Sequence, residues 1–100
     1  MALSIDKNID GGNVVLNLSG RLDTVTSPQL ESVLDEVLPG ATDLVFDLEG
    51  LEFISSAGLR LILRAQKTMN TQGSMRLTHV ADAVAEIFDI TGFTDFLAIE

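Results

Sequence analysis

Apolar and polar residues alternate on both sides of a turn near the N-terminus. Leu3 and Ile5 alternate with polar neighbours, and residues 14–18 are mostly apolar. Asp10-Gly11-Gly12, between these two segments, is typical of a tight turn. An apolar residue at every second position indicates a strand with one buried face. The pattern therefore predicts an antiparallel hairpin, followed by a loop over residues 20–26.

A helical period begins after this loop. Apolar residues recur at spacings of three and four, which places them on one face of a helix: Leu30, Val33, Leu34, Val37 and Leu38. Thr26, with Gln29 three residues later, can cap its start, and so can Ser27, with Pro28 next in the chain. Pro39-Gly40 ends the helix, because neither residue suits a helix interior.

A second strand-and-helix pair follows. Residues 43–48 carry apolar side chains at consecutive positions, as a strand covered on both faces does. We expect a loop after residue 48 and then a helix over residues 56–70. The inner face of this helix is predicted to contain Leu59, Ile62, Leu63 and Met69.

The C-terminal part repeats the alternation. Gln72-Gly73 is a turn, and the pattern predicts a strand at residues 75–78, a helix at 81–90 ended by Gly92, and a short last strand at 96–99. Strands that alternate with helices favour parallel crossovers. The sequence therefore predicts one α/β domain over residues 1–100. It has a mixed sheet of about five strands, begun by the antiparallel hairpin, and about three helices.

Composition favours a cytoplasmic globular domain. Apolar residues make up 46% of the 100 residues, which is enough for a core, but no apolar run exceeds four residues, so no membrane-spanning helix is expected. The N-terminus lacks the basic start and apolar centre of a signal peptide. The chain has no cysteine, which removes disulfides and thiolate metal sites and agrees with a reducing compartment.

The charge narrows the choice of partners. Fifteen acidic residues against six basic ones give a net charge of −9, which disfavours nucleic acid and anionic membrane surfaces and favours basic protein partners. Arg60, Arg64 and Lys67 depart from this acidity at helical spacing. This basic stripe is either a solvated helix face or a surface that steers an acidic partner.

Groups that could perform catalysis are few. His79 is the only histidine, and a lone histidine before a helix is most often a packing or helix-end residue. Asp47 and Glu49 resemble an acid-base pair, but a strand end favours structural or solvated roles for them. No phosphate-binding glycine loop, nucleophile-base pair or metal-loop spacing is present in the sequence. We therefore expect no catalytic residue, no metal, no cofactor and no enzymatic activity.

Two adjacent serines precede the second predicted helix. Ser55 or Ser56 can cap this helix, and the same helix start, with free N–H groups and positive potential, suits a phosphate. Residue chemistry alone leaves both roles open. Gly58, in the first turn, costs a helix about 0.5–1 kcal/mol relative to alanine. One explanation is that its missing side chain lets a partner backbone or a nucleotide phosphate approach Ser56.

Two sequence motifs resemble those of a known family. G-R-L-D-x-x-T, at residues 20–26, is followed at residues 44–59 by a strand and then D-L-x-x-L-x-F-I-x-S-x-G-L. Both resemble anti-sigma factor antagonists of the STAS domain family, and the resemblance covers nearly the whole chain. It implies that the serine two places before the glycine, Ser56, is phosphorylated, and that Asp23 is the loop aspartate beside it.

The resemblance implies a cytoplasmic phosphoprotein that acts in bacterial signalling and transcription regulation. Its partners would be a serine kinase that is also the anti-sigma factor, bound before phosphorylation and released after it, and a serine phosphatase. The partner-binding residues implied or suggested by position are Asp23, Ser55, Ser56, Ala57, Gly58 and Arg60.

The motif departs from the family at two places. Ser55 replaces the usual Asp before the acceptor, and Ala57 replaces the frequent Ser or Thr after it. Ser55 is therefore the second candidate acceptor. The alternative function is a non-catalytic scaffold or transport-system subunit, in which both serines only cap the helix.

Overall fold

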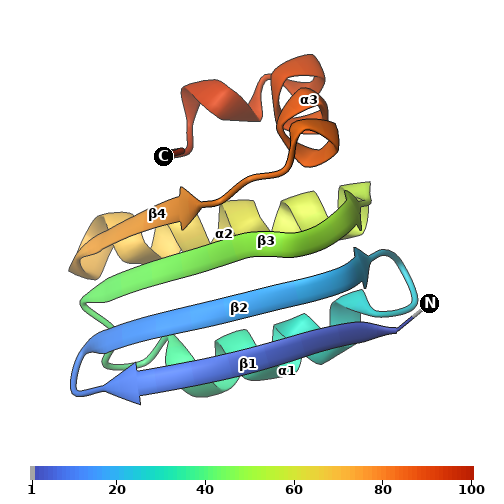
Figure 1. Ribbon diagram of the computed structural model, residues 1–100. Coiled ribbons are helices and arrows are strands. Elements are labelled where there is room, and N and C mark those ends of the chain that lie inside the picture. Colours follow the sequence, from blue (N-terminus) through green and yellow to red (C-terminus); the bar gives the residue numbers. More distant parts are fainter. Residues whose placement is uncertain (1) are drawn as a thin grey trace.

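Four strands form a mixed sheet in the computed structural model, which describes residues 2–100. Their order is β1-β2-β3-β4, with bounds Leu3–Asp10, Asn13–Leu22, Asp43–Ile54 and Ser74–Thr78 (Figure 1). β1 pairs with β2 antiparallel, and β2–β3 and β3–β4 are parallel. The predicted class, an N-terminal hairpin followed by parallel strands, is confirmed.

Helices α1 (Ser27–Val37) and α2 (Ser56–Gln72) both lie behind the sheet in Figure 1. Helix α3 (Asp82–Thr91) and the 3-10 helix η1 (Phe93–Asp95) lie beyond β4. β4 pairs only with the first part of β3, and α3 contacts β3 as well. Among residues 2–100, no helix combines the length and the apolar character that a membrane span requires.

The core fills the space between the sheet and the two helices behind it. Alternate residues of the strands point into it, and the predicted stripe of α1 meets them, with Val33 only half-buried and the other four residues buried. On α2, Leu63 is half-buried and the other predicted core residues are buried. The largest fully buried side chains include Phe46, Leu16, Leu34 and Ile62. Periodicity therefore located the core correctly.

The predicted last strand at residues 96–99 is wrong, and the sheet has four strands rather than about five. Gly92, with φ 78°, ends α3, and η1 takes up the next three residues. Only a short segment then runs beside β4, where Leu77 and Ile99 form an isolated parallel bridge. The N–H of Leu77 donates to the Ala98 carbonyl at 2.8 Å. The apolar residues of this segment cover the edge of β4 without forming a strand.

Parts of two predicted loops are strand instead, whereas residues 23–26 remain a loop. β2 continues through Leu22 and β3 through Ile54, and these extensions pair with each other, with register shifts after Asn17 and Gly20. Glu49-Gly50 looks like a loop in sequence, yet Gly50 lies opposite Ser19 in the sheet. Pairing between β2 and β3, which are distant in sequence, makes these residues strand, and no local sequence pattern indicates it. As a consequence, β2 and β3 end side by side at the same edge of the sheet.

Candidate functional site

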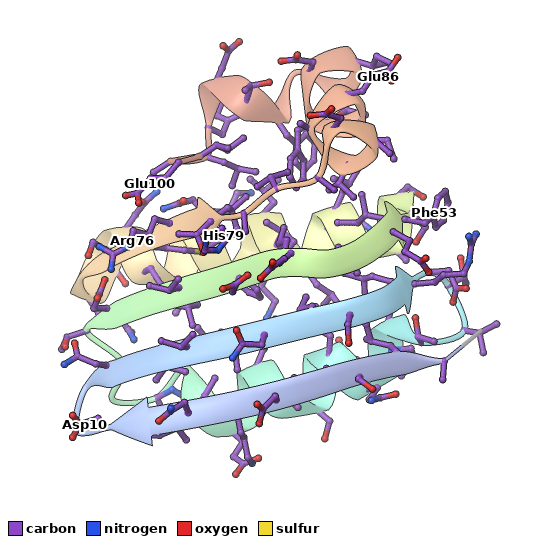
Figure 2. The ribbon with its side chains drawn as sticks, viewed as in Figure 1. Asp10, Phe53, Arg76, His79, Glu86 and Glu100 are labelled. Carbon is purple, nitrogen blue, oxygen red and sulfur yellow. The ribbon has the colours of Figure 1, made fainter. Side chains whose placement is uncertain are left out.

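β2 and β3 end side by side and place the two segments of interest together. Leu22 pairs with Ile54 at the end of the parallel ladder, and the N–H of Ser55 donates to the Leu22 carbonyl at 2.8 Å. Phe53, labelled at the end of β3 in Figure 2, lies under the Arg21 guanidinium, whose Cζ is 4.3 Å from the ring centroid. The loop that contains Asp23 and the start of α2 therefore leave the sheet as neighbours.

Ser55 caps α2. Its backbone is extended, with φ −93° and ψ 174°, and its Oγ accepts a hydrogen bond from the N–H of Gly58 at 3.3 Å. Its carbonyl accepts the N–H of Leu59 at 2.9 Å. This is the N-cap arrangement in which a hydroxyl takes up an otherwise unpaired backbone donor. The Ser55 hydroxyl therefore has a structural function.

Ser56 is the first residue of α2, and its side chain is exposed. Within residues 2–100 its hydroxyl makes no hydrogen bond, in contrast to that of Ser55. The first turn of α2 carries no acidic residue, so nothing on the helix itself offsets the positive potential of its N-terminus. The structure thus gives the two serines different surroundings, whereas the sequence motif only placed Ser56 before Ser55 as the candidate acceptor.

Asp23 organises the loop that faces this helix start. Its Oδ1 accepts the N–H groups of Val25 and Thr26, each at 3.0 Å, and the Thr26 hydroxyl at 3.2 Å. Its carbonyl accepts both the N–H and the hydroxyl of Ser27. Thr26 occupies the N-cap position of α1 without a capping bond from its side chain, which bonds to the Arg21 carbonyl instead.

These donors also set the acidity of the loop carboxylate. The N–H of Thr26 is the largest influence lowering the pKa of Asp23 below its ordinary value, and partial burial opposes it. The Thr26 hydroxyl, the N–H of Val25 and the charge of Arg21 lower the pKa further. Hydrogen bonds to the charged form favour it, so Asp23 is a firmly ionised group of the site.

Gly58 has a packing role that the sequence did not reveal. It is buried, and a Cβ built on it would lie 2.7 Å from Leu22 Cγ and 2.9 Å from Ile54 Cγ1. Its missing side chain therefore lets α2 approach the ends of β2 and β3. The expectation that this glycine opens a path to Ser56 for a partner is replaced by an internal close approach.

A hollow of about 260 Å³ lies between the Asp23 loop, the start of α1 and the start of α2. Its lining is Thr24, Ser27, Pro28, Glu31, Ala57, Arg60 and Leu61. Val25, at the tip of the loop, is 86% exposed, although it is apolar. Arg60 is exposed as well. A small, partly apolar surface with charged residues at its border therefore adjoins Ser56.

The STAS domain model matches residues 4–100 of this chain. The chain belongs to the STAS domain family. BtrV of Bordetella bronchiseptica, a candidate anti-sigma factor antagonist, is 37% identical over 99% of this STAS domain and 85% of its own length. The anti-sigma-B factor antagonist of Bacillus subtilis is 26% identical, and the alignment covers 99% of this chain and 92% of that protein.

Solved structures share the fold of this STAS domain. An anti-sigma factor antagonist from Mycobacterium paratuberculosis matches with a TM-score of 0.89 and 23% identity, covering 98% of this chain and 85% of the other. SpoIIAA, a cell fate determinant of Bacillus, has been solved in two forms. The unphosphorylated form gives a TM-score of 0.83 at 20% identity, with 97% and 88% covered. The phosphorylated form gives a TM-score of 0.76 at 19% identity, and the match covers 97% of this chain and 91% of SpoIIAA.

The three residues of the basic stripe, Arg60, Arg64 and Lys67, differ in their contacts: Arg64 is paired with acidic residues of α1, and the other two are exposed. Arg64 forms an ion pair with Asp35 of α1. Its guanidinium nitrogen Nη1 also lies 3.8 Å from Oε2 of Glu31, which is on α1 as well. The carboxylates, Asp35 first, raise the pKa of Arg64. Arg60 and Lys67 are exposed, and within residues 2–100 neither belongs to an ion pair. Sequence spacing alone could not show this division, because the partners of Arg64 lie on another helix.

Asp47, Glu49 and His79 gather elsewhere on the STAS domain. His79 Nδ1 is 3.1 Å from Asp47 Oδ2, and one potential ligand atom from each residue lies within 4.8 Å of the others. Such a set could hold a divalent cation. Figure 2 shows His79 beside β4, away from Phe53 and the end of β3. Asp47 lies eight residues before Ser55 along an extended strand, about 25 Å away, so Asp47 and Glu49 do not form an acid-base pair beside the serines.

Proposed function

We propose that this STAS domain is an anti-sigma factor antagonist whose binding is switched by phosphorylation of Ser56. The observation that carries the proposal is the exposed, uncommitted hydroxyl of Ser56 at the start of α2, next to Ser55, whose hydroxyl is used as a cap. In the unphosphorylated form the domain binds an anti-sigma factor that is also a serine kinase. In the phosphorylated form it is released.

The names of similar proteins support this proposal. Relatives that align with nearly the whole chain are named as antagonists of anti-sigma factors. SpoIIAA has the same fold and is reported both with and without phosphate. Matching folds make a similar switch geometrically feasible here, and the position of Ser56 supplies the acceptor.

The chain contributes an acceptor rather than a catalyst. Ser56 Oγ forms a bond to the γ-phosphorus of ATP held by the kinase, the bond to ADP breaks, and the hydroxyl proton passes to a base of the kinase. A serine phosphatase hydrolyses the phosphoester and restores the binding form. In this role the domain is a non-enzymatic regulator in the cytoplasm, and it needs no cofactor of its own.

Phosphorylation acts on the surface and leaves the fold in place. It adds a charge of about −1.5 to −2 at pH 7, at a helix start whose positive potential tolerates an anion. The domain already carries a net charge of −9. A partner surface that fits a neutral serine would then bury an unmatched dianion, and the complex would separate. Each tenfold loss of affinity needs only about 1.4 kcal/mol.

The test uses the adjacent serine as a matched control. Ser55→Ala and Ser56→Ala variants are incubated with the kinase and ATP, and intact mass and peptide mass spectra are recorded. We expect one phosphate on the wild type and on the Ser55→Ala variant, and none on the Ser56→Ala variant. Phosphate that persists in the Ser56→Ala variant would move the acceptor to another residue.

Calorimetry then tests the release step. The phosphorylated protein should bind the kinase at least about tenfold more weakly than the unphosphorylated protein, with an unchanged circular dichroism spectrum. Ser56→Asp should weaken binding less than phosphate does, and Ser56→Ala should bind like the wild type. Equal affinities for all these forms would contradict the switch and leave the scaffold or transport-subunit role.

A further inference from the structure

Arg60 is a cation one helical turn beyond Ser56, and it is uncommitted. It is exposed, and within the described chain it takes part in no ion pair, whereas Arg64, one turn further on, is held by Asp35 and Glu31. Arg21, at the nearby end of β2, lies over the ring of Phe53. Of these three arginines around the helix start, only Arg60 has no partner among residues 2–100.

Helix geometry sets the relation between Ser56 and Arg60. Both belong to α2, at positions i and i+4, so their Cβ atoms lie about 5–6 Å apart on the same face. An anion at position i and a cation at i+4 is the favourable orientation for such a pair, and the anion at the first residue of α2 also suits the positive end of the helix dipole. The guanidinium can reach a phosphate on Ser56 without any change in the backbone.

We propose that Arg60 binds the phosphate of Ser56 within the same helix and so holds the phosphorylated form as an internally neutralised state. The inference rests on the proposed function, because it concerns the same modified residue. Arginine binds phosphate oxygens through two parallel N–H donors, which makes this contact stronger than an ordinary exposed ion pair. The N–H groups of the first turn of α2 add to it.

The surrounding charges leave Arg60 available for this contact. Glu31 of α1 borders the same hollow but lies 3.8 Å from Arg64. Asp23, in the facing loop, directs Oδ1 to the N–H groups of its own loop. Phosphorylation therefore changes the surface twice: it adds a dianion at Ser56, and it withdraws the Arg60 cation from any acidic group of the partner.

The experiment uses protein in which phosphoserine is incorporated at position 56 during translation, so that it does not depend on the kinase. The second ionisation of the phosphate is followed by 31P NMR in the wild type, in Arg60→Met and in Lys67→Met. Lys67 is the matched control, since it is an exposed cation of the same helix that forms no ion pair within residues 2–100 and lies three turns from Ser56. A nearby cation favours the dianion.

We expect the second pKa of the phosphate to be about 0.2 to 0.4 higher in Arg60→Met than in the other two proteins. Phosphorylation should also raise the melting temperature of the wild type and of Lys67→Met more than that of Arg60→Met. Superimposable titrations in all three proteins would overturn the Arg60 contact. That result leaves the kinase affinities untouched, so failure of the contact and failure of the proposed switch can be told apart.

Discussion

Adjacent serines at the start of α2 have different surroundings, and helix geometry explains the difference. The N-cap residue directs its hydroxyl back to the first turn, whereas the next residue points outward. Ser55 accordingly accepts the N–H of Gly58, and Ser56 is exposed. At this scale a cap and a phosphorylation site coexist on neighbouring residues, and each can be altered without the other.

Ser55→Ala should destabilise the domain, because it removes the capping bond of α2. We expect a loss of about 1 kcal/mol, which corresponds to a decrease of about 4–8 °C in Tm. Ser56→Ala should stay within about 0.5 kcal/mol of the wild type. Thermal and urea unfolding followed by circular dichroism measure both. Ser55→Asp, which retains a capping acceptor, should recover most of the loss. A larger effect at Ser56 would reverse the assignment.

Asp23 makes stability depend on pH in the acid range. Its pKa is lowered in the folded state, chiefly by the N–H of Thr26, so its contribution is fully present above the ordinary value of about 3.9. That contribution is lost as the pH falls through the lower folded value. Asp23→Asn should therefore melt below the wild type at neutral pH, and the difference should narrow as the pH falls below the ordinary pKa of an aspartate.

The control for this series is Asp10→Asn, which removes the same charge in the exposed hairpin turn. If the Asp23→Asn difference stays constant from neutral to acid pH, or matches that of Asp10→Asn, the loop carboxylate has no special role. Melting temperatures of the three proteins at each pH decide the matter.

At the scale of elements, the position of α2 depends on how closely it approaches the sheet. β3 runs directly into this helix, with only Ser55 between them. Gly58 lies against Leu22 and Ile54, the last residues of β2 and β3. The close approach fixes the start of the helix relative to the Asp23 loop, and so it holds together the two parts of the candidate site.

Gly58→Ala should destabilise the domain, although alanine is the better helix former. In an exposed helix the substitution would stabilise by about 0.5–1 kcal/mol. Here the added Cβ would lie 2.7 Å from Leu22 Cγ, and overpacking of this kind typically costs about 1–3 kcal/mol. Urea unfolding measures the difference. In a Leu22→Ala background the same substitution should cost less, and a gain in the wild-type background would contradict the close approach.

At the scale of the whole molecule, the dominant electrostatic quantity is the net charge of −9. The domain measures 32 × 28 × 20 Å, so at low salt its acidic groups interact across its full width. The Debye length is about 30 Å at 0.01 M salt and about 8 Å at 0.15 M. The ion pairs, such as that of Lys7 with Glu36, are exposed and worth little.

Salt should therefore stabilise the folded domain. Raising the ionic strength between these limits should increase the free energy of unfolding by on the order of 1 kcal/mol, about 4–8 °C in Tm, because self-repulsion is screened. Scanning calorimetry in sodium chloride and in potassium chloride should give equal shifts, since screening depends on ionic strength and not on the cation. A Tm that falls with salt would mean that the ion pairs outweigh the repulsion.

Local patterns in the sequence determined the elements and the region of the site. The apolar period of α1, the turn at Gly11 and the helix stop at Gly92 are properties of short segments, and the structure has all three. The same holds for the helix that starts at Ser56 and for the loop that contains Asp23. Short segments carry this information because backbone preference and burial period act over a few residues.

Only the tertiary structure determined how segments that are distant in sequence pair and pack. The extension of β2 and β3 through Glu49-Gly50, and the single bridge at Ile99 in place of a fifth strand, depend on pairing partners that lie far apart in the chain. The packing of Gly58 against Leu22 and the ion pair of Arg64 with Asp35 likewise join residues more than 25 positions apart. The separation of Ser56 from the capping Ser55 also needed the backbone of β3 and α2, because identical side chains differ only in the direction that the chain gives them.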